Sequence, residues 1–244
     1  MLVNNKKIQL DKAKENTTIL SEIKENFIIL DDNTYPNKKN INRIGEEISK
    51  YDYKVKILSI NNLMEKVRNY LYLKNINLKD YTIVTVGEGG KQVFKALNKD
   101  ALEVIEIKWS RNWKSEISNE FITNIETFNF KSKNIILIED VIATGETLYN
   151  IIFEIKRKGG NVKKIICAII NESSPLIDKS FAETIVAAKI MSKDSENPFW
   201  YPAIYSTRHL FYGDEEMPKF YEVHNDKYFK DDKIEREIKK MRSE

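Results

Sequence analysis

The sequence predicts an α/β protein with a mostly parallel central sheet, helices on both faces of that sheet, and further segments at both ends of the chain. Apolar runs of strand character alternate with segments of helical spacing over most of the sequence. Such alternation is typical of parallel strands that are buried on both faces and joined by crossover helices. The length of 244 residues suits one such domain with additions.

The strands and helices are expected in regular succession. Residues 61–74 carry apolar side chains at positions 63, 64, 67, 70, 71 and 73, which is a helical spacing. The apolar residues of 148–155 also share one helix face, and the glycine pair at 159–160 ends that helix. Residues 87–90 are expected to form a turn and residues 108–120 a polar loop. Strands are expected at 27–30, 53–60, 81–86, 101–107, 121–130, 134–138, 162–170 and 184–190, and further helices at 40–51 and 91–97.

Three segments are expected along the chain. Residues 1–52 form an N-terminal extension or cap, residues 53–190 the α/β core, and residues 191–244 a C-terminal extension. The last segment contains the most aromatic stretch of the sequence, at 197–214, and ends in a charged tail. The core is therefore expected to hold the sheet, and the two ends to embellish it.

The charge and cysteine content exclude several classes of protein. The chain has 40 basic and 37 acidic residues with the two signs interspersed, which is not the pattern of a general nucleic-acid binder. Its single cysteine, Cys167, lies in an apolar run and is interpreted as a core residue, and a disulfide framework is excluded. No apolar stretch approaches the roughly 18 residues of a membrane span, and the N-terminus lacks the pattern of a signal peptide. A cytoplasmic protein without a membrane partner is expected.

The residues that carry chemistry concentrate in the segment 135–148. An apolar strand ends there in two adjacent acids, Glu139 and Asp140, and a turn of small and hydroxyl residues leads into a helix. Backbone N–H groups at a helix start bind anions such as phosphate, and Gly145 permits a close approach. The two carboxylates can accept hydrogen bonds from a vicinal diol or hold Mg²⁺ through its water shell. Helix capping by Thr144 is the purely structural alternative.

This segment resembles the signature by which type I phosphoribosyltransferases bind phosphoribosyl pyrophosphate (PRPP). The match covers residues 135–147 without a gap: an apolar strand, two acids, and a loop of a small residue, Thr, Gly, any residue and Thr. The resemblance implies that Glu139 and Asp140 are the catalytic acids and bind the ribose hydroxyls, and that Asp140 also faces the Mg²⁺ ion carried by PRPP. Relatives are usually dimers, so a homodimer is implied as well. The implied 5′-phosphate-binding residues are Ala143, Thr144, Gly145, Glu146 and Thr147.

Two further landmarks of the family bind pyrophosphate, and both have counterparts in this chain. A glycine-rich turn at 87–91 precedes a helix, and its backbone N–H groups and lysine can meet the pyrophosphate charge. A basic segment at 108–114 stands where the family has a mobile loop that covers the reacting centre. An ordinary turn and an ordinary basic surface loop are the structural alternatives. The implied pyrophosphate-binding residues are Glu88, Gly89, Gly90, Lys91, Lys108, Arg111 and Lys114.

The acceptor base is specified less closely. Family members that act on 6-oxopurines usually have an aspartate before the phosphate-loop threonine, whereas this chain has Ala143, as many adenine, orotate and uracil enzymes do. The aromatic stretch supplies side chains that can stack on a planar base or bind its polar edge, and the candidates are Trp200, Tyr201 and Arg208. Aromatic packing of a C-terminal extension is the structural alternative.

The sequence therefore indicates a Mg²⁺-dependent phosphoribosyltransferase that transfers the 5-phosphoribosyl group of PRPP to a nitrogenous base and releases pyrophosphate. Its partners would be PRPP and a nucleobase-like acceptor. Two alternatives stay open: a PRPP-binding regulatory protein without transferase activity, and a phosphoribosyltransferase with a non-salvage acceptor. The near-neutral charge and the lack of a helix-turn-helix pattern count against a regulator that binds nucleic acid.

Overall fold

The computed structural model describes residues 17–23, 25, 27–50, 54–111, 121–143, 145–171, 182, 184–191 and 203–212. The chain divides into two compact units, which are described separately. The first unit is drawn from Met1–Lys24, Asn61–Ser110 and Ile122–Tyr201, and the second from Glu25–Ile60, Arg111–Phe121 and Pro202–Glu244.

The first unit is built on a parallel sheet. Its strands lie side by side in the order β1-β11-β10-β9-β5-β6, and β2 also pairs with β11. Every pairing between these described strands is parallel, so the α/β class predicted from the alternation is confirmed. The strands are β1 (Thr17–Ile19), β2 (Glu22–Ile23), β5 (Thr82–Val86), β6 (Glu103–Ile107), β9 (Asn134–Ile142), β10 (Asn161–Asn171) and β11 (Thr184–Met191).

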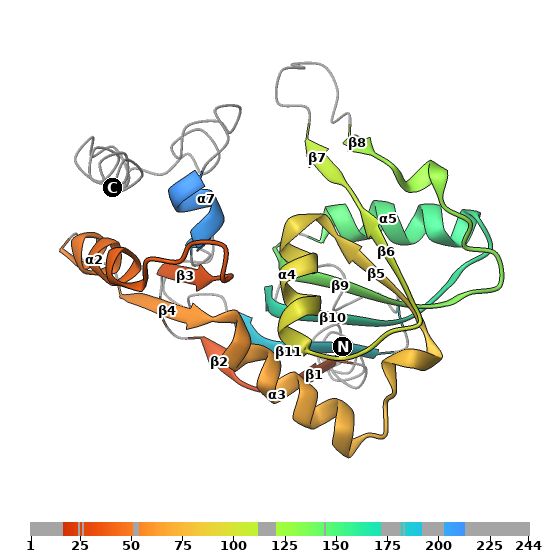
Figure 1. Ribbon diagram of the computed structural model, residues 1–244, viewed down its shortest axis with the longest axis horizontal. Coiled ribbons are helices and arrows are strands. Elements are labelled where there is room, and N and C mark those ends of the chain that lie inside the picture. Colours follow the sequence, from red (N-terminus) through yellow and green to blue (C-terminus); the bar gives the residue numbers. More distant parts are fainter. Residues whose placement is uncertain are drawn as a thin grey trace, which may run out of the picture. The chain divides into compact units, whose positions relative to one another are not determined.

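The helices described in the first unit cover the sheet from both sides (Figure 1): α3 (Ile60–Leu73), α4 (Gly87–Leu97) and α5 (Glu146–Arg157). On one face α4 packs against β9 and β5, and on the other face α5 packs against β10. Two short 3₁₀ helices, η1 (Leu78–Asp80) and η2 (Ile125–Thr127), come before β5 and β9 in the chain. In the part of the chain that the structure describes, no helix is long and apolar enough to span a membrane.

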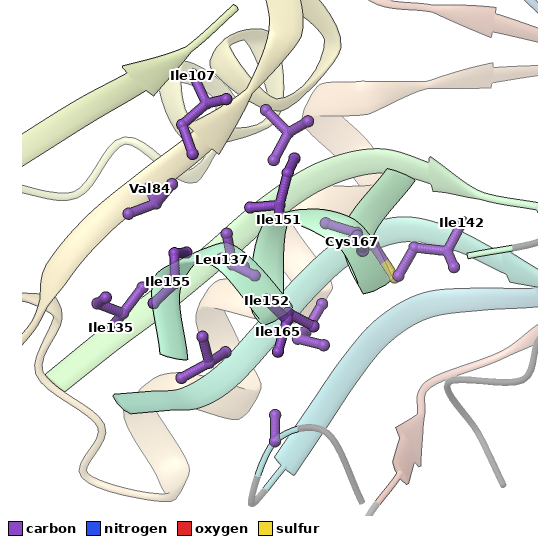
Figure 2. Packing of buried hydrophobic residues seen from close by; sticks show 14 of the residues in the cluster. Val84, Ile107, Ile135, Leu137, Ile142, Ile151, Ile152, Ile155, Ile165 and Cys167 are labelled. Carbon is purple, nitrogen blue, oxygen red and sulfur yellow. The ribbon is translucent and has the colours of Figure 1, made fainter. Parts of the chain in front are cut away.

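The main core lies between α5 and the sheet. Side chains alternate between the two faces of a strand, and this alternation directs Ile135 and Leu137 of β9 toward α5. The apolar face of α5, which its spacing predicts, is fully buried against them (Figure 2). Ile136 and Ile138 take the opposite face and are also buried, so β9 is covered on both sides. The α5 residues in this core are Leu148, Ile151, Ile152 and Ile155.

Cys167 on β10 is fully buried in the same core, which confirms its interpretation as a core residue. In the parallel register it lies beside Glu139 of β9. Burial raises the pKa of the Cys167 thiol, and the charges of Glu139 and Asp140 raise it further. The thiol is therefore held neutral beneath the end of β9.

The second unit is a small sheet with the strand order β12-β3-β4, in which both pairings are parallel. Its elements are β3 (Phe27–Asp31), α2 (Lys38–Ser49), β4 (Val55–Ser59), β12 (Ala203–Ser206) and α7 (Thr207–Tyr212). The Thr207 hydroxyl donates a 2.6 Å hydrogen bond to buried Asp32, and the rings of Tyr35 and Phe211 stack with centroids 3.8 Å apart. Residues from both expected extensions, 1–52 and 191–244, thus contribute to one sheet, while the three-segment division itself stays a prediction.

Three local predictions are wrong. Residues 87–90, expected as a turn, form the first turn of α4, because the glycines fit against β9, as described below. The segment 108–120, expected as a loop, contains strand β7 (Trp109–Arg111), which pairs with β8 (Phe121–Thr123). The strand expected at 121–130 ends after three residues and gives way to η2, where the Thr127 hydroxyl donates to the carbonyl oxygen of Asn124 at 2.7 Å and closes the turn.

At the amino-terminal ends of the strands, opposite the end that carries the acid pair, Glu103 of β6 contacts the neighbouring strand β5. It forms an ion pair with Lys133 and accepts a 2.6 Å hydrogen bond from the hydroxyl of Thr82. The hydrogen bonds from Lys133 and Thr82 lower the pKa of Glu103. A carboxyl group whose pKa is lower in the folded state contributes stability above its unfolded pKa of about 4.3, and loses that contribution as the pH falls through the folded pKa.

We therefore expect Glu103→Gln to lower the Tm at pH 7 and to have little effect at about pH 2–3, where the wild-type carboxyl is protonated as well. Thermal unfolding at both pH values measures this. Glu65→Gln, at an exposed position on α3, is the control and should leave the Tm unchanged at both. An equal effect of Glu103→Gln at the two pH values would contradict an ionic contribution.

Candidate functional site

The candidate site lies at the carboxyl ends of β5 and β9. These two neighbouring strands mark the point where the order of strands along the sheet switches direction. From β5 the chain continues through α4 to β6 on one side, whereas from β9 it continues through α5 to β10 on the other. In open α/β sheets the crevice at such a switch point is where ligands bind. Both α4 and α5 begin at this edge, on opposite faces of the sheet (Figure 1).

The acid pair lies where β9 extends beyond its last pairing with β5. The register between β5 and β9 ends at Thr85 and Ile138, so Glu139 and Asp140 lie just beyond it, and both are half-buried. Each carboxylate accepts a hydrogen bond from the next backbone N–H: Glu139 from Asp140 at 3.1 Å and Asp140 from Val141 at 2.8 Å. Strand alternation places Asp140 on the α4 face and Glu139 on the α5 face. The two carboxylates therefore flank the strand end from both sides.

The first turn of α4 lies directly against this strand end. A Cβ atom on Gly89 would stand 2.3 Å from Cγ of Asp140, and one on Gly90 would stand 2.3 Å from the carbonyl oxygen of Ile138. Only glycine leaves room for such an approach. The backbone of the glycine-rich turn is thereby held beside the Asp140 carboxylate.

The N-cap residues of α4 and α5 have no polar side chain that could close the first turn. The N-cap of α4 is Val86 and that of α5 is Gly145, and neither contributes a side-chain hydrogen bond to the first turn. Gly145 has φ of +80°, a left-handed conformation that favours glycine. By contrast, the Asn37 side chain caps α2 by accepting a hydrogen bond from the N–H of Asn40 at 3.2 Å. The two helix starts at the sheet edge therefore present backbone N–H groups and positive dipole ends to an anion.

The residues implied in 5′-phosphate binding follow the acid pair. Ala143 is exposed in the turn after β9, Gly145 is the N-cap, and Glu146 and Thr147 form the start of α5. Thr144 lies outside the described residues. Strand β9 extends through the acid pair to Ile142, four residues beyond the predicted strand at 134–138. The turn and the helix follow as predicted, and the binding roles themselves stay predictions.

Of the residues implied in pyrophosphate binding, those on α4 have partners within the chain. The Lys91 ammonium group pairs with Glu106 of β6 at 3.1 Å. The hydrogen bond and charge of Glu106 raise the pKa of Lys91, and the charge of Glu88 adds to this, so Lys91 stays cationic. Glu88 accepts a 2.6 Å hydrogen bond from Gln92, one turn further along the helix.

The basic segment after β6 begins at the same edge of the sheet. Lys108 is exposed, and its backbone N–H donates a 2.8 Å hydrogen bond to the Asn124 side chain, which in turn donates to the carbonyl oxygen of Glu106 at 3.1 Å. Arg111 is the last residue of β7, and Lys114 lies outside the described residues.

The residues proposed for base recognition are not brought together within the described part of the chain. Arg208 is half-buried on α7 of the second unit, and Trp200 and Tyr201 lie outside the described residues. Sequence reasoning also missed two residues that organise this edge, Glu106 and Asn124. A signal for Glu106 was present in the sequence, because alternation between Ile105 and Ile107 turns its side chain to the face opposite theirs.

The described residues include no group of three or more His, Cys, Asp or Glu side chains arranged to hold a metal ion. Mg²⁺ does not require such a group, because it retains several waters and commonly binds through one or two carboxylates together with substrate phosphates. The half-buried oxygen donors of Glu139 and Asp140 fit that mode of binding.

This geometry defines a class of protein: an open α/β protein whose switch point is suited to bind an anion. Residues 54–195, more than half of the chain, match the family described as phosphoribosyl transferase domain. The chain belongs to that family. Among curated proteins, none matches this chain.

Solved structures of phosphoribosyltransferases align with this chain at low identity. A purine phosphoribosyltransferase from Pyrococcus horikoshii Ot3 is 16% identical, with 78% of this chain and 96% of that chain covered and a TM-score of 0.38. A hypoxanthine phosphoribosyltransferase from Staphylococcus aureus is 18% identical, with 55% and 74% covered and a TM-score of 0.38. An adenine phosphoribosyl transferase from Trypanosoma brucei is 15% identical, with 55% and 67% covered and a TM-score of 0.37. These likenesses are too distant to assign a substrate to this chain.

The close approach of α4 to β9 predicts a strong effect of one added methyl group. Gly90→Ala places a Cβ 2.3 Å from a backbone oxygen, so the strand end must shift, and we expect a loss of about 1–3 kcal/mol of unfolding free energy. Gly45→Ala in α2 is the matched control, because its Cβ would lie 3.3 Å from the Cδ1 atom of Ile57 and alanine favours a helix interior by about 0.5–1 kcal/mol. Chemical denaturation measures both. Equal stability of the two variants would contradict the tight packing at Gly90.

Proposed function

We propose that this chain is a Mg²⁺-dependent phosphoribosyltransferase that transfers the 5-phosphoribosyl group of PRPP to a nitrogenous base and releases pyrophosphate. The observation that carries the proposal is that α4 and α5 begin on either side of the acid pair, each with an N-cap residue that makes no side-chain hydrogen bond. PRPP has a phosphate at one end, a pyrophosphate at the other and a vicinal diol between them. The edge offers an anion site, a pair of hydrogen-bond-accepting carboxylates and a second anion site in matching order.

In the proposed complex, the start of α5 binds the 5′-phosphate and the acid pair binds the ribose. Backbone N–H groups at 145–147, with the hydroxyl groups of Thr144 and Thr147, donate to the phosphate oxygens. Glu139 and Asp140 accept hydrogen bonds from the two ribose hydroxyls. Such contacts fix the position of the anomeric carbon relative to the turn that holds the pyrophosphate, and positioning of this kind lowers the barrier to transfer.

The reaction exchanges one bond at the anomeric carbon for another. A nitrogen lone pair of the base forms the new C–N bond, the C–O bond to pyrophosphate breaks, and pyrophosphate leaves with that electron pair. The transition state resembles an oxocarbenium ion, as in glycoside cleavage. The negative carboxylate of Asp140, held on the α4 face beside Gly89, stabilises the positive charge that develops on the ribose.

Mg²⁺ bound to PRPP supplies charge neutralisation at the departing pyrophosphate. In the proposed complex the Asp140 carboxylate holds the water shell of that ion rather than binding it within a protein cage.

In the proposed complex, the glycine-rich turn and nearby cationic side chains bind the pyrophosphate. Gly89 and Gly90 contribute backbone N–H groups, and Lys91 contributes a positive charge. The ion pair of Lys91 with Glu106 is partly exposed, and exposed pairs contribute little to stability. Pyrophosphate can therefore draw Lys91 away from Glu106 at small energetic cost. Lys108, Arg111 and Lys114 are proposed to cover the leaving group from the adjacent segment.

The acceptor is proposed to be a base other than a 6-oxopurine, since Ala143 stands where enzymes for those bases usually have an aspartate. Trp200, Tyr201 and Arg208 are the proposed base-binding residues. We further propose that the protein acts as a cytoplasmic homodimer.

Pyrophosphate release from PRPP, measured with Mg²⁺ across a panel of purine and pyrimidine bases, tests the proposal. Release with one base would identify the acceptor together with the activity. Asp140→Asn is expected to lower the rate at least about tenfold, because it removes the charge that stabilises the transition state.

Asp100→Asn is the matched control. Asp100 is an exposed acid that pairs with Lys79 at 3.3 Å, just before β6 and so at the opposite edge of the sheet, and its loss should leave the rate unchanged. An unchanged rate in Asp140→Asn would contradict the role assigned to Asp140. PRPP binding without pyrophosphate release for any base would favour a regulatory protein.

A further inference from the structure

A buried hydroxyl group beside the candidate site has no hydrogen-bond partner. Thr85 is the next-to-last residue of β5 and is fully buried. Its Oγ1 atom makes no hydrogen bond to any residue that the structure describes. A buried polar group without a partner costs folding free energy, and such groups in folded proteins call for a specific explanation. The neighbours of Thr85 on the strand are apolar, so valine would fill this position without that cost.

The position of Thr85 places its side chain under the first turn of α4. Val84 and Val86 belong to the core on the α5 face, so alternation turns Thr85 to the opposite face, toward α4. Its register partners are Ile138 on β9 and Glu106 on β6. The carbonyl oxygen of Ile138 is the atom that Gly90 approaches so closely. The hydroxyl therefore lies next to the turn that is proposed to bind pyrophosphate.

That turn is poorly suited to remain helical. Three of its first four residues are glycines, at 87, 89 and 90, and each glycine weakens a helix relative to alanine. Gly87 has φ of +57°, and the N-cap Val86 supplies no side-chain hydrogen bond. A change in backbone conformation between two arrangements is therefore inexpensive at this turn.

We propose that Thr85 is a positioning residue for the pyrophosphate-binding turn, an inference that rests on the proposed phosphoribosyltransferase function. In the arrangement described here the hydroxyl is unpaired. When the turn adjusts to bind the pyrophosphate group of PRPP, its backbone forms a hydrogen bond with the Thr85 hydroxyl. A ligand shifts an equilibrium only through its different affinity for the two states, and the Thr85 bond lowers the energy of the PRPP-binding state alone.

Two variants of Thr85 and one control separate this role from a merely structural one. Thr85→Val keeps the shape and removes the hydroxyl, and Thr85→Ser keeps the hydroxyl and removes a methyl group. Thr82→Val is the matched control: Thr82 lies on the same strand, at its other end, and its hydroxyl donates to Glu103 at 2.6 Å. The measurements are the Tm of the ligand-free protein and the affinity for PRPP in the presence of Mg²⁺, by calorimetry.

Thr85→Val should raise the Tm by about 2–4 °C, because an unsatisfied buried hydroxyl is removed, and should weaken PRPP binding about tenfold. Thr85→Ser should lower the Tm, because the lost methyl leaves a small cavity, yet retain affinity within about twofold of wild type. Thr82→Val should lower the Tm and leave PRPP affinity unchanged. Stability and affinity thus change in opposite directions at position 85, which loss of packing alone would not produce.

Three results would overturn the inference, and they are distinguishable. If Thr85→Val binds PRPP as wild type does, the hydroxyl has no role in binding, while the proposed function stands. If Thr85→Ser loses as much affinity as Thr85→Val, the methyl group rather than the hydroxyl is responsible. If the wild-type protein itself binds no PRPP, the proposed function fails, and the role of Thr85 fails with it.

Discussion

The contact on which the candidate site depends is the packing of two glycines of α4 against the end of β9. Gly90 lies over the carbonyl oxygen of Ile138, and Gly89 lies over the carboxylate of Asp140, each so close that a methyl group would collide. This packing is possible because β9 extends beyond its last pairing with β5, which leaves the strand end open to the first turn of α4. It brings the N–H groups of one helix start beside an acid that belongs to another strand–helix unit. Without it, the starts of α4 and α5 would not lie at the same point of the sheet.

The chain uses the same local plan twice, with opposite outcomes. Strand β3 also ends in two acids, Asp31 and Asp32, and as in the first unit the helix N-cap is the sixth residue after the first acid, with a helix of 12 residues following it. There a lysine and two hydroxyl groups pair with the acids: Lys38 donates to both oxygens of Asp31, and the hydroxyl groups of Thr34 and Thr207 both donate to Oδ1 of Asp32. The buried Oδ2 of Asp32 accepts no hydrogen bond from the residues that the structure describes. What distinguishes the first unit is a helix start that its own cap side chain does not close.

The features that depend on local sequence could be predicted, and those that depend on which strands are neighbours could not. The strand at 134–138 with its acid pair and the apolar face of α5 follow from spacing and residue type. The start of α4 at Gly87 was missed because glycine has low helix propensity. The reason for the glycines at 89 and 90 is their packing against β9, which follows much later in the chain. The pairing of Lys91 with Glu106 required β6 to lie beside β5. The joining of residues 27–31 and 203–206 in one sheet had no local signal at all.

The candidate site combines a closed apolar core with polar groups at one edge of the sheet. The core under α5 is apolar and fully buried. Around the starts of α4 and α5 lie the half-buried acid pair, two N-cap residues that contribute no side-chain hydrogen bond, and the buried Thr85 hydroxyl, which has no partner among the residues that the structure describes. The stability of that core permits an edge whose groups are arranged for a ligand rather than for one another. At the acid pair and the start of α5 such groups bind with little reorganisation, since the fold holds them in place before the ligand arrives. The glycine-rich turn of α4, by contrast, is proposed to adjust. A charged sugar phosphate that forms hydrogen bonds with these groups would therefore bind more tightly, because folding has already paid the entropy of ordering them.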